Sequence, residues 1–116
     1  MTRRLIKSFH FAFNGLKKVW QTEKNFRIHS LIALGVIIAA FYLGIQSFDY
    51  LLLLLVIALL LILEILNSSL ERLVDMLSPS THHFAKEIKD LLASAVLVAA
   101  VLAAIVGVVV FWPYLF

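Results

Sequence analysis

Three long apolar runs dominate the chain, and they limit the folds that it can adopt. They cover residues 30–45, 50–66 and 91–116. A helix needs about 20 mostly apolar residues to cross a bilayer, and each run reaches or approaches that length with its flanks. Hydrophobic residues make up 63% of the 116 residues, so no soluble portion is large enough to bury three such helices. The sequence therefore predicts one integral membrane domain, 1–116, built only of helices.

Lysine and arginine positions predict how the chain crosses the membrane. All ten lie in two segments, seven before Ile28 and three from Arg72 to Lys89. The positive-inside rule then places the N-terminus and segment 67–90 in the cytoplasm and the C-terminus on the opposite side. We expect spans at about 26–48, 50–66 and 91–116, with the second helix continuing as a cytoplasmic extension to 77. Pro79 is expected to end that helix.

An amphipathic helix is predicted at about 3–21, before the first span. Apolar residues recur there at helical spacing while lysines take the opposite face, which is typical of a helix lying on a membrane surface. The apolar residues are Ile6, Phe9, Phe13, Leu16 and Trp20.

A stripe of polar side chains follows the second apolar run. Glu64, Asn67, Glu71 and Asp75 are spaced three, four and four residues apart, which puts them on one helix face. Ionisable residues at membrane depth are rare and usually functional. The stripe therefore predicts a site, although spacing alone also fits a solvated face with Glu64 paired to a neighbouring helix.

Further polar residues are expected at the same cytoplasmic depth. Glu23 precedes the first span, and Lys89 and Asp90 precede the third. Carboxylates, an amide and a lysine at one depth suit a magnesium-bound polyphosphate, because Mg²⁺ prefers one or two carboxylates and takes other oxygens from phosphates and water. The chain has no Walker or kinase-type glycine loop, so such a site would be of an unusual kind.

The segment EILNSSLERLVD (64–75) resembles the signature of the prokaryotic diacylglycerol kinase family, which includes diacylglycerol and undecaprenol kinases. The resemblance extends to FNGL, TEKNFRIH and IKDLLASAVLVAA, and so covers almost the whole chain. It implies an enzyme of the bacterial inner or plasma membrane that uses ATP and Mg²⁺ to phosphorylate a lipid alcohol. It also implies a homotrimer with shared active sites; we expect no nucleic-acid partner.

The resemblance also assigns roles to individual positions. Glu64 matches the catalytic base, and Glu23 and Glu71 match the metal-holding carboxylates. Nucleotide contacts are implied for Arg4, Lys7, Phe11, Glu23, Asn67, Glu71, Asp75, His82, Lys89 and Asp90. Lipid contacts are implied for Arg4, Phe26, Arg27, Glu64 and Ala93.

Several points stay open at the level of sequence. Leu92 stands where the family favours Gly or Ala, and Phe11 lacks the hydroxyl of a tyrosine. His29, with FNGL and TEKNFRIH, is closer to the undecaprenol branch, but the acceptor is not determined. The four histidines are too scattered to predict a metal site. The alternative function is that of a small non-enzymatic membrane protein, such as a pore former or assembly subunit.

Overall fold

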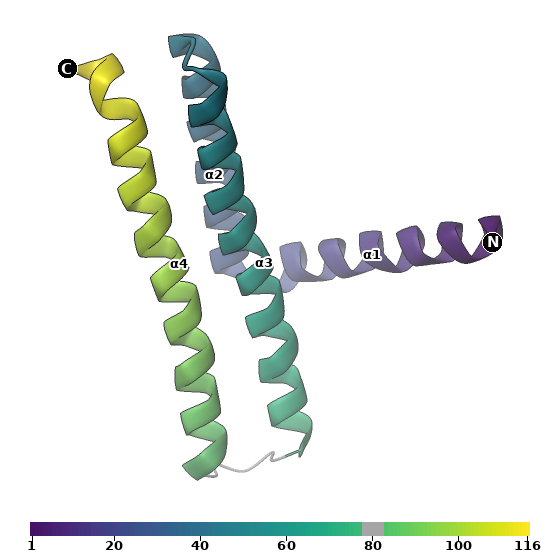
Figure 1. Ribbon diagram of the computed structural model, residues 1–116. Helices are drawn as coiled ribbons and strands as arrows, with labels where there is room; N and C mark the ends of the chain where they lie inside the picture. Colours follow the sequence, from purple (N-terminus) through teal and green to yellow (C-terminus); the bar gives the residue numbers. More distant parts are fainter. Residues whose placement is uncertain (78–82) are drawn as a thin grey trace.

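The computed structural model describes residues 1–77 and 83–116, which form four helices and no strand. These are α1 (Thr2–Thr22), α2 (Lys24–Leu43), α3 (Ser47–Leu77) and α4 (His83–Leu115). Helices α2, α3 and α4 are long and apolar enough to cross a membrane. They run side by side, while α1 extends away across their direction (Figure 1). The predicted all-helical membrane fold is confirmed; the trimer stays a prediction.

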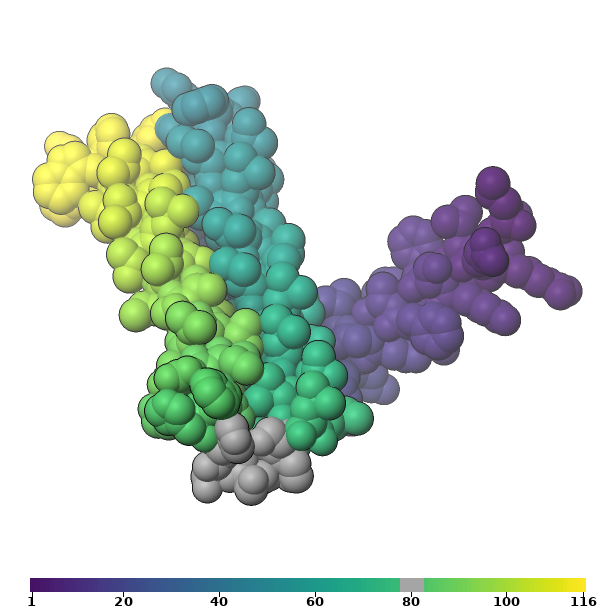
Figure 2. Space-filling view, turned by 60° about the horizontal axis from the view of Figure 1, so that its bottom comes forward, coloured from purple at the N-terminus to yellow at the C-terminus, as the bar shows by residue number. Residues whose placement is uncertain are grey.

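The junction between α1 and α2 is a single extended residue, Glu23. Its backbone angles, φ −111° and ψ 105°, interrupt the helical path, although its N–H still donates to the carbonyl of Val19 at 2.9 Å. The chain therefore turns sharply at Glu23, and α1 stands apart from the body of the molecule (Figure 2). This arrangement suits a helix lying on the membrane surface beside three spanning helices.

Helix α2 ends at Leu43, so the expected span of about 26–48 is too long. Gly44 adopts φ 64°, in the left-handed region that favours glycine. The N–H of Gly44 donates to Phe41, and the N–H of Ile45 donates to Ala40, as in a Schellman motif. Phe48 consequently belongs to α3. With 20 residues, α2 is about 30 Å long, which matches the hydrocarbon core of a bilayer.

The main packed core lies near the α2–α3 turn. Ala40, Ile45, Leu53 and Val110 are buried together there. The Tyr114 hydroxyl accepts a hydrogen bond from the Gln46 N–H at 3.2 Å and lies 3.4 Å from a carboxylate oxygen of Asp49.

Helix α3 has 31 residues and is about 46 Å long, so it exceeds the hydrocarbon thickness. Its last turns carry the polar stripe.

Candidate functional site

Glu64 is the first and most deeply buried residue of the polar stripe. Its side chain is 7% exposed, and Oε1 lies 2.5 Å from Nδ1 of His29 on α2. Its other oxygen, Oε2, is buried and has no hydrogen-bond partner among the residues that the structure describes. Buried polar atoms are usually paired, and an unpaired one is costly. One carboxylate oxygen is thus held in place, and the other is available to a donor that the described residues do not supply.

Glu23 lies beside α3 because the α1–α2 junction contacts that helix. Its Oε1 accepts a hydrogen bond from the Ser68 hydroxyl at 2.8 Å and lies 3.7 Å from the Arg72 guanidinium. Arg72 also donates to Oγ1 of Thr22 at 2.7 Å. These contacts place the end of the first basic segment beside Arg72 of the second.

Asn67 and Glu71 continue the stripe toward the end of α3. Asn67 is partly buried, and within residues 1–77 and 83–116 its Oδ1 has no hydrogen-bond partner. Glu71 is partly exposed and lies close enough to Lys89 to act on it electrostatically. Asn67 and Glu71 follow Glu64 along one face of α3. Amide and carboxylate oxygens are the ligand type that Mg²⁺ selects.

Lys89 joins α4 to the stripe. Its Nζ lies 2.5 Å from the Asp75 carboxylate, ahead of the apolar part of α4 that begins at Leu91. The hydrogen bond with Asp75 raises the pKa of Lys89 above its ordinary value. The lysine therefore stays protonated at neutral pH. Asp90 instead contacts Lys86 of its own helix at 2.8 Å, so it is not drawn into the stripe.

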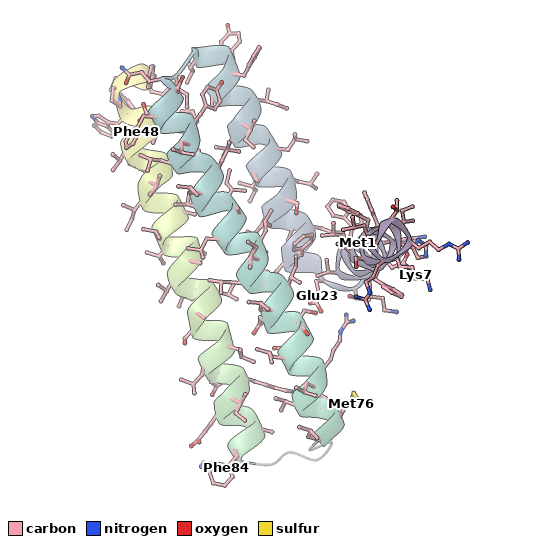
Figure 3. The ribbon with its side chains drawn as sticks, turned by 45° about the vertical axis from the view of Figure 1, so that its right-hand side comes forward. Met1, Lys7, Glu23, Phe48, Met76 and Phe84 are labelled. Carbon is pink, nitrogen blue, oxygen red and sulfur yellow. The ribbon has the colours of Figure 1, made fainter. Side chains whose placement is uncertain are left out.

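Other predicted site residues lie apart from this cluster. Arg4, Lys7 and Phe11 are exposed on α1, whose N-terminal part extends away from the three long helices (Figure 1). Figure 3, in which α1 is seen nearly end-on, shows Lys7 to one side of these helices. Ala93 is exposed on α4. His82 lies outside the described residues.

Phe26 and Arg27 have structural contacts within the chain. Phe26 is buried, and Nη1 of Arg27 donates to the carbonyls of Trp20 and Gln21 at 2.8 and 3.0 Å. These carbonyls belong to the last turn of α1, where backbone acceptors lack helical partners. Arg27 therefore caps α1.

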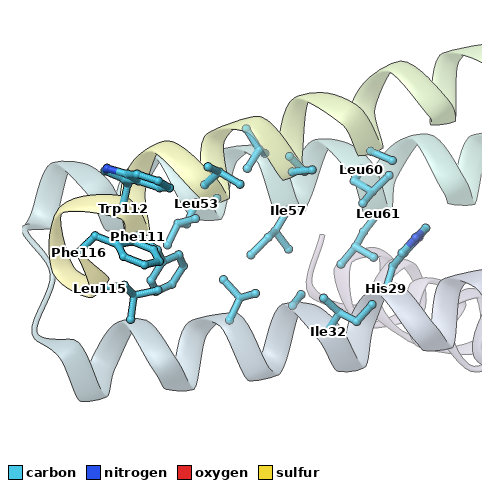
Figure 4. Close-up of a pocket in the computed structure, with 18 residues that line it drawn as sticks. His29, Ile32, Leu53, Ile57, Leu60, Leu61, Phe111, Trp112, Leu115 and Phe116 are labelled. Atoms are coloured by element: carbon cyan, nitrogen blue, oxygen red, sulfur yellow. The ribbon is translucent and has the colours of Figure 1, made fainter.

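An apolar cavity of about 600 Å³ lies between α2, α3 and α4. His29, Leu60 and Leu61 lie at one end of it, and Trp112 and Phe116 at the other (Figure 4). His29 is the one ionisable side chain among the described residues that line it. Because His29 also contacts Glu64, the cavity ends beside the buried carboxylate.

Sequence reasoning missed four residues of this cluster: Thr22, His29, Ser68 and Arg72. A histidine near the start of a membrane span is a signal, because a polar ring at that depth needs a partner. Its partner Glu64 is 35 residues away in the chain, so spacing could not identify the pair. Within the described residues, no group of three or more His, Asp or Glu side chains is arranged to hold a metal ion.

Comparisons with known proteins identify the family of this chain. Residues 10–111 match the family described as prokaryotic diacylglycerol kinase. The chain is 36% identical over 112 residues to undecaprenol kinase of Bacillus subtilis, covering 97% of this chain and 91% of that protein. It is 31% identical over 111 residues to diacylglycerol kinase of Escherichia coli K12, and the match covers 96% of this chain and 91% of that protein.

A diacylglycerol kinase of Synechocystis is 42% identical over 104 residues, which cover 89% of this chain and 59% of that protein. The family match and the two nearly full-length relatives agree with the three apolar helices. The chain therefore belongs to the prokaryotic diacylglycerol kinase family of membrane lipid kinases.

Proposed function

We propose that this lipid kinase transfers the γ-phosphate of ATP to the hydroxyl of diacylglycerol or undecaprenol. The products would be phosphatidic acid or undecaprenyl phosphate. The observation that carries the proposal is the buried Glu64, which has one unpartnered oxygen and lies beside the end of an apolar cavity. Such a cavity accepts a hydrocarbon chain, and the adjoining carboxylate accepts a proton from the alcohol at its end.

Glu64 is the proposed general base. The acceptor oxygen attacks the γ-phosphorus as the bond to the oxygen bridging the β- and γ-phosphates breaks, and ADP leaves. The hydroxyl proton passes to Oε2 of Glu64. Most of the acceleration in such a transfer comes from positioning and electrostatic stabilisation.

Glu23 and Glu71 are the proposed holders of Mg²⁺. Asn67, on the same face of α3 as Glu71, has an amide oxygen without a partner among the described residues. Two carboxylates suffice, because Mg²⁺ completes its shell from phosphates and water. The bound ion would neutralise phosphate charge. Lys89 supplies a further positive charge from α4, and Asp75 orients it.

The remaining contacts are proposed from the family resemblance. Arg4, Lys7, Phe11, His82 and Asp90 would contact the nucleotide, and Arg4, Phe26, Arg27 and Ala93 the lipid. A homotrimer in the bacterial inner or plasma membrane, with its N-terminus in the cytoplasm, belongs to the same proposal. The exposed apolar faces of the helices that could span the membrane support this arrangement, because both lipid and neighbouring subunits can cover them.

A non-enzymatic pore is not favoured. The residues of the polar stripe and their partners lie along the C-terminal half of α3, and the lining of the cavity is almost entirely apolar. A water-filled path needs polar groups along its length.

The test offers diacylglycerol and undecaprenol separately, in mixed micelles, to the purified protein with labelled ATP and Mg²⁺. We expect label on one lipid well above the other, and loss of labelling for Glu64→Gln and Glu71→Ala. Glu87→Gln, at an exposed position on α4, is the matched control. Near-normal turnover of Glu64→Gln would overturn the assignment of Glu64 as the base. If the folded protein labels neither lipid, both diacylglycerol and undecaprenol are excluded as acceptors.

A further inference from the structure

The contact between His29 and Glu64 joins two helices at the point where the proposed chemistry occurs. His29 lies on α2, and its side chain is 30% exposed. Glu64 lies on α3, and its side chain is 7% exposed. The contact joins Nδ1 to Oε1, while Oε2 has no hydrogen-bond partner in the described part of the chain. The ring therefore engages one oxygen of the carboxylate and leaves the other free.

The chemistry of the imidazole and the carboxylate determines which atom donates the hydrogen bond. An ionised carboxylate only accepts hydrogen bonds, so Nδ1 of His29 must carry the hydrogen. A carboxylate bound through one oxygen loses its freedom to rotate, and this sets the direction of the second oxygen. His29 also lines the apolar cavity, so the same ring forms part of the wall against which an acceptor lipid would lie.

We propose that His29 is a positioning residue for phosphoryl transfer: it holds Oε1 of Glu64 so that Oε2 meets the hydroxyl of the acceptor lipid. The proposal rests on the proposed role of Glu64 as the base. It assigns His29 no contact with ATP or metal, and no proton is transferred to the ring. The ring acts through Glu64 alone.

A purely structural link between α2 and α3 is the competing explanation. Three substitutions of His29 distinguish the positioning role from the structural link, because each places its hydrogen-bond donor differently. In His29→Asn the amide nitrogen is as many bonds from Cβ as Nδ1 is, so it can reach Oε1. In His29→Gln the amide nitrogen corresponds to Nε2 instead, and His29→Leu has no donor.

The experiment measures kcat, KM for ATP and KM for the lipid in mixed micelles, with thermal unfolding of each variant. We expect His29→Leu and His29→Gln to lower kcat roughly 10- to 100-fold with little change in KM for ATP, and His29→Asn to recover most of the loss. Equal activity of the Asn and Gln variants would overturn the proposal. So would a loss of activity that follows only the loss of folded protein.

A double mutant separates this inference from the proposed function. If His29 acts through Glu64, adding His29→Leu to Glu64→Gln causes no further loss in the residual rate. A further loss as large as the one that His29→Leu causes in the wild-type protein would overturn the positioning role. If Glu64→Gln itself stays active, the base assignment fails; if it is inactive while His29→Leu is normal, only the inference fails.

Discussion

The Ser68 hydroxyl donates a 2.8 Å hydrogen bond to Oε1 of Glu23, so α3 orients a carboxylate that lies at the junction of α1 and α2. The two residues are 45 positions apart in the chain. This bond links the surface helix to the polar stripe. The orientation of a proposed Mg²⁺ ligand therefore depends on how α2 packs against α3.

Ser68→Ala should weaken the response to Mg²⁺ more than it changes the maximal rate. Losing one hydrogen bond of about 1 kcal/mol would raise the Mg²⁺ concentration for half-maximal activity about fivefold. Titration of kinase activity with Mg²⁺ measures this. Ser69→Ala is the control, because Ser69 is the exposed neighbour on the same helix. An equal response of both variants would contradict the prediction.

Lys89→Met should reduce kcat far more than Lys86→Met. Lys89 lies across from α3 and contacts Asp75, whereas Lys86 is paired with Asp90 on its own exposed helix face. Removing a positive charge that stabilises a transferring phosphoryl group costs roughly 100-fold or more. The rate of ADP release reports the effect. Comparable losses in the two variants would show that general charge, not the position of Lys89, is what matters.

Arg27→Met should loosen the C-terminal turn of α1. The guanidinium donates to the carbonyls of Trp20 and Gln21, and without it those acceptors rely on water. Hydrogen–deuterium exchange should become faster at the end of α1 while α3 is unchanged. Lys24→Met, at an exposed neighbouring position, is the control. Unchanged exchange in Arg27→Met would show that the cap is dispensable.

Gly44→Ala should destabilise the fold by about 1 kcal/mol, because φ of 64° is strained for a residue with a Cβ. Gly35→Ala is the matched control: Gly35 lies within α2, its added Cβ would meet no atom within 4 Å, and alanine favours a helix. Unfolding in mixed micelles with a denaturing detergent measures both. Destabilisation of equal size in the two variants would exclude the conformational explanation.

Local sequence was enough to predict features that depend on one segment. The three apolar runs predicted helices long enough to cross the membrane, and the structure confirms that there are such helices in α2, α3 and α4. Residues 64–75 determined that Glu64, Asn67, Glu71 and Asp75 share a face, because helical periodicity alone sets that relation. The expected first span was too long, because the chain turns at Gly44 before it reaches Phe48.

Only the tertiary structure decided which distant residues meet. His29 with Glu64, Ser68 with Glu23, and Lys89 with Asp75 each join different helices or a junction and a helix. Such pairs depend on the register and rotation of one helix against another, which side-chain packing sets and no periodic pattern encodes. Sequence therefore determined that this chain has a polar stripe at the end of a membrane helix, and packing decided that one oxygen of Glu64 is held while the other is left free.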